Sequence, residues 1–167
     1  SRLLGIAGVM GGAYSEVEDS TTDILLEAAH FDAVSVARSS RRHKLHSEAA
    51  KRFERGTDPL LPAVAAQRAV DLLVQYGGGQ ADPAVFDLNT LPAPTSYEFA
   101  LSDAERLTGV SYSPERVCEL LEQVGCVLED IDGQRVRVTP PSWRPDLTGS
   151  AHFVEEIARL DGYDRIP

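Results

Sequence analysis

The sequence predicts an α+β protein made of two small units, and three observations lead to this prediction. Glycines alternate with small apolar residues over residues 5–12, and an apolar run of strand length follows at residues 24–29. A proline-containing stretch, residues 89–96, precedes a second pattern in the order helix, helix, hairpin, helix. Grouped rather than regularly alternating strands and helices are typical of the α+β class. We therefore expect one unit, of mixed α and β structure, over residues 1–91 and a winged-helix-like unit over residues 92–167.

The first unit is expected to combine a buried strand, or a strand and turn, at residues 3–9 and a strand at residues 24–29 with three helices. Asp32 and Ser47 each precede a helical stretch, where a short oxygen-bearing side chain accepts the first free backbone N–H groups. A longer helix is predicted to begin at Pro59, because proline at the first helical position loses no hydrogen bond. This helix places its apolar residues on one face. They are Leu61, Ala65, Ala69, Leu72, Leu73 and Tyr76.

The second unit carries the clearest helical pattern of the chain. Ser113 and Pro114 open this helix, and apolar residues recur at the spacing of one helix face until Gly125. Asp132-Gly133 between two apolar stretches is a strong hairpin signal. A final helix is predicted over residues 152–160.

Glu27 is the residue that fits its surroundings least. It lies inside the apolar run 24–29, and a carboxylate buried without a partner costs several kcal/mol or more. Either Glu27 meets a specific partner, or the run is an edge strand that turns Glu27 toward water. Periodicity alone leaves both interpretations open.

Composition limits the function classes. The chain has 167 residues, 43% of them hydrophobic and 25% charged, with a net charge of −10. This is an ordinary globular composition without an apolar run long enough to span a membrane, and the expected location is the cytoplasm. Cys118 and Cys126 lack metal-ligand spacing and are expected to be reduced thiols. The acidic balance argues against nucleic-acid binding over the whole surface.

The charge is unevenly distributed along the chain. Residues 38–55 carry seven Lys and Arg against two Glu, a net charge of +5, so the remainder carries −15. Arg41, Arg42 and Lys44 lie in this basic segment. A local basic patch on an acidic protein can bind a phosphate backbone. A solvated helix face is the alternative interpretation.

Four motifs, taken in order, resemble one family. They read GIAGVMGG, ILLEAAHFD, SEAAKRFERGTDP and PPSWRPDL followed by VEEIARLDGYDRIP. This combination is similar to the beta chain of bacterial phenylalanyl-tRNA synthetase over essentially all 167 residues. The resemblance identifies the first unit with the second half of the B3/B4 editing domain and the second unit with the B5 domain.

The resemblance implies an editing pocket that recognises the hydroxyl group of tyrosine. It places Gly11, Glu27, Ser47 and Ala49 in that pocket, with Glu27 accepting the hydrogen bond from the phenol. Ser47 stands where the family usually has threonine, so the hydroxyl is kept and a methyl group is lost. A histidine that the family places in the pocket lies upstream of Ser1. Little deacylation is therefore expected of residues 1–167 alone, and no catalytic residue is assigned in this chain.

The resemblance also implies a Mg²⁺ site shared with the alpha chain. Its positions here are Asp146, His152, Glu155 and Glu156, with His152 where the family has aspartate. Neutral imidazole suits Mg²⁺ poorly, since this ion prefers oxygen ligands. The alternative is a solvated pair of glutamates, with Glu155 paired to Arg159 one helical turn away.

The implied enzyme binds ATP and charges tRNA(Phe) with phenylalanine as an alpha2-beta2 heterotetramer. The implied partners are the alpha chain, tRNA(Phe), phenylalanine and tyrosine, with no membrane. Arg41, Arg42 and Lys44 are expected to contact the tRNA. Two other readings compete: an assembly module with a non-functional editing pocket, and a nucleic-acid-binding protein of winged-helix type.

Overall fold

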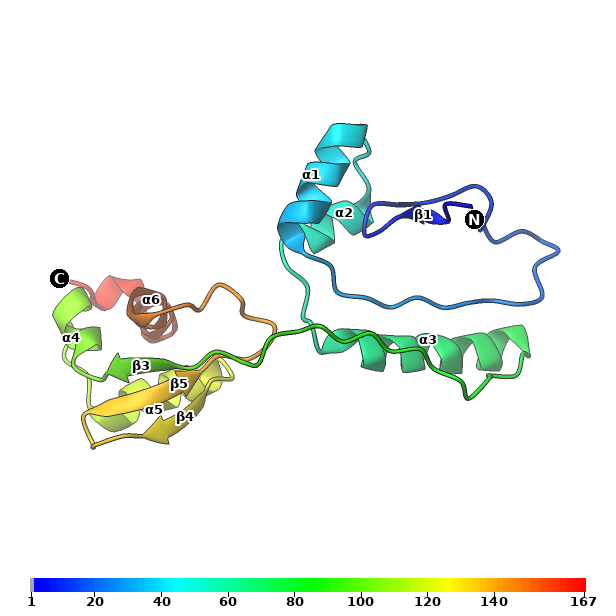
Figure 1. The fold of residues 1–167 in the computed structure, drawn as a ribbon. Coiled ribbons are helices and arrows are strands. Elements are labelled where there is room, and N and C mark those ends of the chain that lie inside the picture. The colour runs from blue at the N-terminus through cyan, green and yellow to red at the C-terminus, as the bar shows by residue number, and fades with distance from the viewer. Residues whose placement is uncertain (1) are drawn as a thin grey trace. The chain divides into compact units, whose positions relative to one another are not determined.

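The computed structural model describes residues 2–167, and the chain divides into two compact units, Ser1–Thr90 and Leu91–Pro167 (Figure 1). Helices and short antiparallel strands occur in both units, which confirms the α+β class. The first unit contains β1 (Gly5–Ile6), β2 (Met10–Gly11), α1 (Ala33–His43), α2 (Glu48–Phe53) and α3 (Leu61–Gly77). The second contains β3 (Tyr97–Ala100), α4 (Asp103–Thr108), α5 (Pro114–Gln123), β4 (Val127–Asp130), β5 (Arg135–Thr139), α6 (Ser150–Asp161) and a 3-10 turn, η1 (Tyr163–Arg165).

The glycine-rich start of the chain forms a tight hairpin. Strands β1 and β2 are antiparallel, with Gly5 opposite Gly11. Gly8 in the turn has a φ of +67°, and a Cβ atom there would lie 2.9 Å from Val36 Cγ2 and 3.0 Å from Phe31 Cδ2. The glycine is needed both for its backbone conformation and for the close approach of the turn to α1.

A small core joins this hairpin to α1 and α2. Val9, Val36 and Ala50 are almost fully buried. The partly buried rings of Phe31 and Phe53 pack edge to face beside them, with centroids 5.1 Å apart. Burial of these side chains holds the hairpin against the two helices.

The predicted caps of α1 and α2 are confirmed. The Asp32 carboxylate accepts a hydrogen bond from the backbone N–H of Ser35 at 2.8 Å. The Ser47 hydroxyl accepts one from the backbone N–H of Ala50 at 3.0 Å. Both side chains satisfy N–H groups that the first turn of a helix leaves free.

The strand expected at residues 24–29 is absent. No strand of residues 2–167 pairs with this stretch, and Leu25 is 94% exposed. Glu27 is exposed as well, so no buried carboxylate arises here. An apolar run gives a segment strand propensity, but a strand forms only where a neighbouring edge takes its backbone hydrogen bonds.

Helix α3 begins two residues later than predicted and has no buried residue. Pro62, rather than Pro59, occupies the first turn. Leu61 is 52% exposed and Tyr76 78% exposed, so the apolar face predicted from periodicity remains largely open within the first unit. The helix ends at Gly77, and the following Gly78 adopts a left-handed backbone conformation.

The second unit is built on a three-stranded antiparallel sheet in the order β3-β5-β4. Strands β4 and β5 form the predicted hairpin, with Gly133 in the turn at a φ of +75°. Val136 and Val138 of β5 are buried, while Arg135 and Arg137 between them are exposed. This alternation turns one face of the sheet toward the helices.

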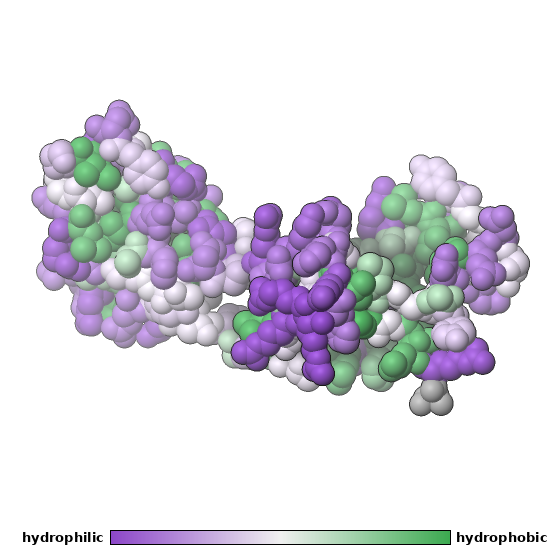
Figure 2. Space-filling model, turned by 90° about the horizontal axis from the view of Figure 1, so that it is seen from above, coloured by the Kyte–Doolittle hydropathy of each residue, from purple (hydrophilic) through white to green (hydrophobic). Residues whose placement is uncertain are grey.

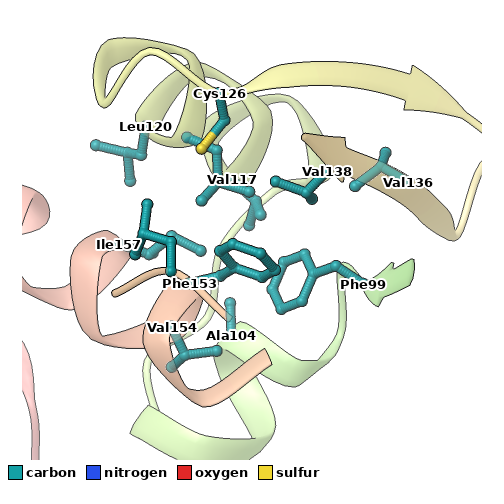
Figure 3. Close-up of a cluster of buried hydrophobic side chains, with 12 residues drawn as sticks. Phe99, Ala104, Val117, Leu120, Cys126, Val136, Val138, Phe153, Val154 and Ile157 are labelled. Carbon is teal, nitrogen blue, oxygen red and sulfur yellow. The ribbon is translucent and has the colours of Figure 1, made fainter. Parts of the chain in front are cut away.

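One hydrophobic core lies between that sheet face and helices α4, α5 and α6 (Figure 3). Phe153 of α6 is fully buried and packs edge to face on Phe99 of β3, with ring centroids 5.6 Å apart. Leu120 and Leu121 of α5 reach the same core from the other helix. The order helix, helix, hairpin, helix is therefore confirmed, with β3 as an added edge strand that the sequence pattern did not predict.

The cysteines and the absence of a long apolar run were the two other expectations from composition. Cys118 and Cys126 are both free thiols, and burial raises the pKa of each thiol. Across residues 2–167 we find no helix with the length and apolar character needed to cross a bilayer.

Candidate functional site

Ser47 connects the hairpin to α2. Its hydroxyl caps the helix and also donates a hydrogen bond to the backbone carbonyl of Val9, at 2.5 Å. Val9 immediately precedes β2, so this bond holds the helix start against the strand that contains Gly11. The structure thus places Ser47 beside the strand that contains Gly11.

Gly11 presents an open stretch of backbone. A Cβ atom built on Gly11 would meet no other atom within 4 Å. By contrast, a Cβ atom on Gly12 would lie 2.9 Å from the carbonyl oxygen of Leu4, so the hairpin itself requires glycine there. Gly11 is not required by packing in this unit, which leaves its backbone accessible to a bound group.

Glu27 and Ala49 are not brought into the same site. Glu27 is exposed in an extended stretch, and no hydrogen bond within residues 2–167 joins it to Gly11 or Ser47. Ala49 lies on the exposed side of α2, while its neighbour Ala50 fills the small core. Of the four predicted pocket residues, Ser47 bonds to the hairpin at Val9, two residues before Gly11, and no hydrogen bond within residues 2–167 joins any two of the four.

A cleft between α1 and α2 lies beside Ser47. It has a volume of about 310 Å³. Polar and basic side chains make up most of its wall: Ser40, Arg41, His46, Ser47, Ala50, Lys51 and Glu54. His46 was not singled out by sequence reasoning, although its place directly before the cap of α2 was a usable signal.

The basic residues predicted to contact tRNA lie at the end of α1. Arg41 and Arg42 occupy its last turn, and Lys44 is its C-terminal cap. All three are exposed. Lys44 has a φ of +55° and is the one non-glycine residue with a positive φ among residues 2–167. Figure 2 shows strongly hydrophilic side chains gathered over this helix in the middle of the view.

Two of the predicted metal ligands in the second unit, Asp146 and Glu156, form ion pairs with arginines. Arg144 Nη2 lies 2.6 Å from Asp146 Oδ2, and Arg144 Nη1 lies 3.0 Å from Glu156 Oε2. Arg159 Nη2 also contacts Glu156 Oε2, at 2.7 Å. Glu156 is 8% exposed, so its carboxylate is largely shielded from water, whereas Asp146 and Arg159 at the edges of the network are exposed. The pair between Glu155 and Arg159, part of the alternative to a metal site, is wrong, because Arg159 pairs with Glu156 instead.

The same arginines lower the pKa of both carboxyl groups. Hydrogen bonds from Arg159 and then Arg144 lower the pKa of Glu156 to about 2. The hydrogen bond from Arg144 likewise holds the pKa of Asp146 below its usual value. Both carboxylates are therefore charged and already neutralised by guanidinium groups.

The four residues do not fit a magnesium ion in this arrangement. His152 and Glu155 are exposed, and His152 Nδ1 lies 3.3 Å from the hydroxyl of Thr148. Across the part of the chain described, no three His, Cys, Asp or Glu side chains are grouped to hold a metal ion. Magnesium prefers several oxygen donors without competing cations, so magnesium binding at Asp146 and Glu156 stays a prediction that this geometry does not support.

Comparison with known proteins assigns both units. A family model described as "B3/4 domain" matches residues 1–78, and one described as "tRNA synthetase B5 domain" matches residues 97–163. The chain therefore joins two domains of the class found in aminoacyl-tRNA synthetases.

Individual relatives identify the family more narrowly. The phenylalanine–tRNA ligase beta subunit of Streptomyces avermitilis is 51% identical over 98% of this chain and 20% of its own length. Those of Bifidobacterium longum and Corynebacterium glutamicum are each 48% identical, over 100% and 99% of the chain and over 19% and 20% of their own lengths. The chain belongs to the family of phenylalanine–tRNA ligase beta subunits, and it spans about a fifth of the length of these relatives.

Proposed function

We propose that this chain is part of a phenylalanine–tRNA ligase, an enzyme that uses ATP to attach phenylalanine to tRNA(Phe). In this proposal the chain lies in the beta subunit and works with an alpha subunit, as an alpha2-beta2 heterotetramer in the cytoplasm. The observation that carries the proposal is the similarity over nearly the whole chain to proteins of that name, with the B3/4 and B5 domains in order.

Within that enzyme, the first unit has a local role in removing tyrosine that was attached in error. A pocket for an apolar side chain rejects an analogue with one added hydroxyl only about 10²-fold. A second site that binds the hydroxyl can hydrolyse the wrong product. The open backbone of Gly11 and the hydroxyl of Ser47, held together by the Val9 hydrogen bond, support such a site in the first unit.

Glu27 is the proposed acceptor for the phenol of tyrosine. It is exposed, and its carboxylate is not engaged by a cation within residues 2–167. The editing role requires the segment around Glu27 to approach Gly11 and Ser47 when tyrosine binds. A charged acceptor suits this task, because hydrogen bonds to ionised groups are about twice as strong as neutral ones.

The variant Glu27→Ala tests the editing role in the assembled ligase. We expect the release of tyrosine from Tyr-tRNA(Phe) to slow by about 10²-fold, in line with the loss of a charged hydrogen bond of about 2–3 kcal/mol. The rate of phenylalanine attachment should stay unchanged. Glu16→Ala, another exposed glutamate of the same loop, is the matched control and should behave like the wild type.

Unchanged tyrosine release by Glu27→Ala would instead favour the second candidate, an assembly module with a non-functional pocket. The observation that favours this second candidate is helix α3, which has no buried residue in the first unit. The third reading, a winged-helix nucleic-acid-binding protein, is disfavoured by α5. That helix carries Glu115, Glu119 and Glu122 and a single arginine, Arg116, already paired with acidic groups.

A further inference from the structure

The turn between α1 and α2 is held in place by a buried serine. Ser40 lies near the end of α1 and is 4% exposed. Its hydroxyl donates to the backbone carbonyl of Leu45 at 2.6 Å, and its own backbone carbonyl accepts from the N–H of Leu45 at 3.0 Å. Two hydrogen bonds thus join the same pair of residues, five positions apart, and fix the course of the chain between them.

The direction of the Ser40 side-chain bond is unusual for a serine in a helix. A helical serine normally faces water or bonds back to a carbonyl of the preceding turn. The Ser40 hydroxyl instead reaches forward, past the end of the helix, to the residue that follows the cap. The cap, Lys44, has a φ of +55°, and a residue with a Cβ atom keeps such a conformation only where its surroundings impose it. The Ser40–Leu45 pair encloses Lys44 and supplies this constraint.

The turn leads directly into Ser47. Only His46 separates Leu45 from Ser47, so the position of Ser47 depends on that of Leu45. A serine hydroxyl has one hydrogen to donate and two lone pairs that accept. Ser47 donates its hydrogen to the Val9 carbonyl and accepts from the N–H of Ala50. It therefore has no donor left for a bound amino acid, and its effect on the site passes through the backbone of the hairpin.

One series of contacts leads from α1 to the open backbone of the hairpin. Ser40 fixes Leu45, Leu45 comes two residues before Ser47, and Ser47 bonds to Val9. Val9 is 2% exposed and comes two residues before Gly11, where an added Cβ atom would meet no other atom within 4 Å. A change at Ser40 therefore reaches Gly11 through backbone and hydrogen bonds, without any side chain of the series touching a substrate.

We propose that Ser40 is a positioning residue of the editing site: through the turn at Leu45 and the Ser47–Val9 bond, its hydroxyl sets the place of the Gly11 backbone. This inference rests on the proposed function, which makes that backbone part of a site that removes tyrosine. Loss of the Ser40 hydroxyl takes a hydrogen bond from the Leu45 carbonyl and releases the turn. A displacement of about 1 Å, even when it starts far from the chemistry, can slow a reaction about 10²-fold.

The variant Ser40→Ala tests the proposal in the assembled ligase. We expect the kcat for release of tyrosine from Tyr-tRNA(Phe) to fall by about tenfold, because the site is displaced by less than the full 1 Å. The KM for Tyr-tRNA(Phe) and the rate of phenylalanine attachment should stay unchanged. A fall in kcat at constant KM reports a loss in the transition state and not a weaker binding of the tRNA.

Asp32→Ala is the matched control for stability alone. It removes the cap at the opposite end of α1, so each of the two variants loses one side-chain hydrogen bond at an end of the same helix. Their melting temperatures should fall by similar amounts, while only Ser40→Ala slows the release of tyrosine. Equal rates of tyrosine release in Ser40→Ala and Asp32→Ala would reduce Ser40 to a structural role and overturn the proposal.

A double-mutant cycle measures whether Ser40 acts through Ser47. If both hydroxyls serve the same series of contacts, the double variant Ser40→Ala/Ser47→Ala should release tyrosine no more slowly than Ser47→Ala alone, because effects within one network do not add. Effects that multiply in the double variant would mean that Ser40 acts independently of Ser47, which contradicts the proposal.

The wild-type ligase separates this inference from the proposed function. If the wild type charges tRNA(Phe) and releases tyrosine while Ser40→Ala behaves like Asp32→Ala, the positioning role is rejected and the proposed function stands. If the wild type does not release tyrosine from Tyr-tRNA(Phe), the editing part of the proposed function is rejected, and the positioning role with it.

Discussion

Glu156 is a largely buried acidic residue that two arginines hold in place. Two guanidinium groups contact its carboxylate, and 8% of the residue is exposed. The network connects the stretch around Arg144 to α6, since Arg144 also binds Asp146. Breaking such a shielded pair is costly, because the remaining charges lose their partner without regaining full hydration.

The pKa of Glu156, lowered to about 2, makes a prediction about pH. A carboxyl group whose pKa is lower in the folded state stabilises the fold above its unfolded pKa of roughly 4.3. That contribution is lost as the pH falls from about 4.3 toward 2. Urea unfolding of the chain should therefore show a steep loss of stability in this window, and the variant Glu156→Gln should flatten it.

Glu156→Gln should also cost about 2 kcal/mol of stability near pH 7, where the wild-type carboxylate is charged. Glu155→Gln changes the exposed neighbour on the same helix and is the matched control. Equal pH profiles for the wild type and Glu156→Gln would show that the arginine network does not stabilise the second unit.

At the scale of elements, the sequence correctly predicted the features that depend on contacts between residues close together in the chain. Asp32, Ser47 and Ser113 each cap the helix that the sequence placed after them. The Asp132-Gly133 hairpin formed as expected, because a turn needs only its own residues and two alternating flanks.

Elements that depend on a distant partner were not predictable in the same way. The run at residues 24–29 has strand propensity, yet it forms no strand, since no edge within residues 2–167 pairs with it. Strand β3 was not predicted, because it is a short strand whose place is set by pairing with β5, more than thirty residues later.

For the candidate site, the cap at Ser47 could be predicted from the sequence, whereas its bond to Val9 could not. The arginines on Asp146 and Glu156 were likewise invisible before folding.

At the scale of secondary-structure elements, the role of Ser47 can be tested by mutation. The variant Ser47→Ala removes the cap of α2, at about 1 kcal/mol, and the bond to the Val9 carbonyl, at about 1 kcal/mol more. The first unit should lose both, which chemical denaturation can measure. Ser47→Thr keeps the hydroxyl and should stay within about 0.5 kcal/mol of the wild type. A loss in Ser47→Thr as large as in Ser47→Ala would mean that side-chain volume, not the hydroxyl, is what matters.

At the scale of the whole molecule, the two units differ in how much apolar surface they bury. Twelve residues make up the buried core of the second unit, from Phe99 to Ile157. The buried core of the first unit consists of Val9, Val36 and Ala50 among the residues described. Because burial of apolar surface is the main stabilising term, the second unit is expected to hold its structure more strongly.

Hydrogen exchange followed by mass spectrometry on the 167-residue chain measures this difference directly. Backbone amides of β5 and α6 should be strongly protected, because they open only when the core of the second unit unfolds. Amides of α3 should exchange much faster, since that helix buries no side chain in its unit. Similar protection in α3 and α6 would contradict the difference between the units.

We propose that this chain serves an enzyme that attaches phenylalanine to tRNA and removes tyrosine. The most direct measurement supplies the assembled ligase with tRNA(Phe), ATP and both amino acids, and follows what accumulates on the tRNA. We expect phenylalanyl-tRNA to accumulate while tyrosine is attached and released, with continued ATP use and little tyrosyl-tRNA. Absence of phenylalanine attachment would contradict the claim outright, and steady accumulation of tyrosyl-tRNA would contradict its editing part.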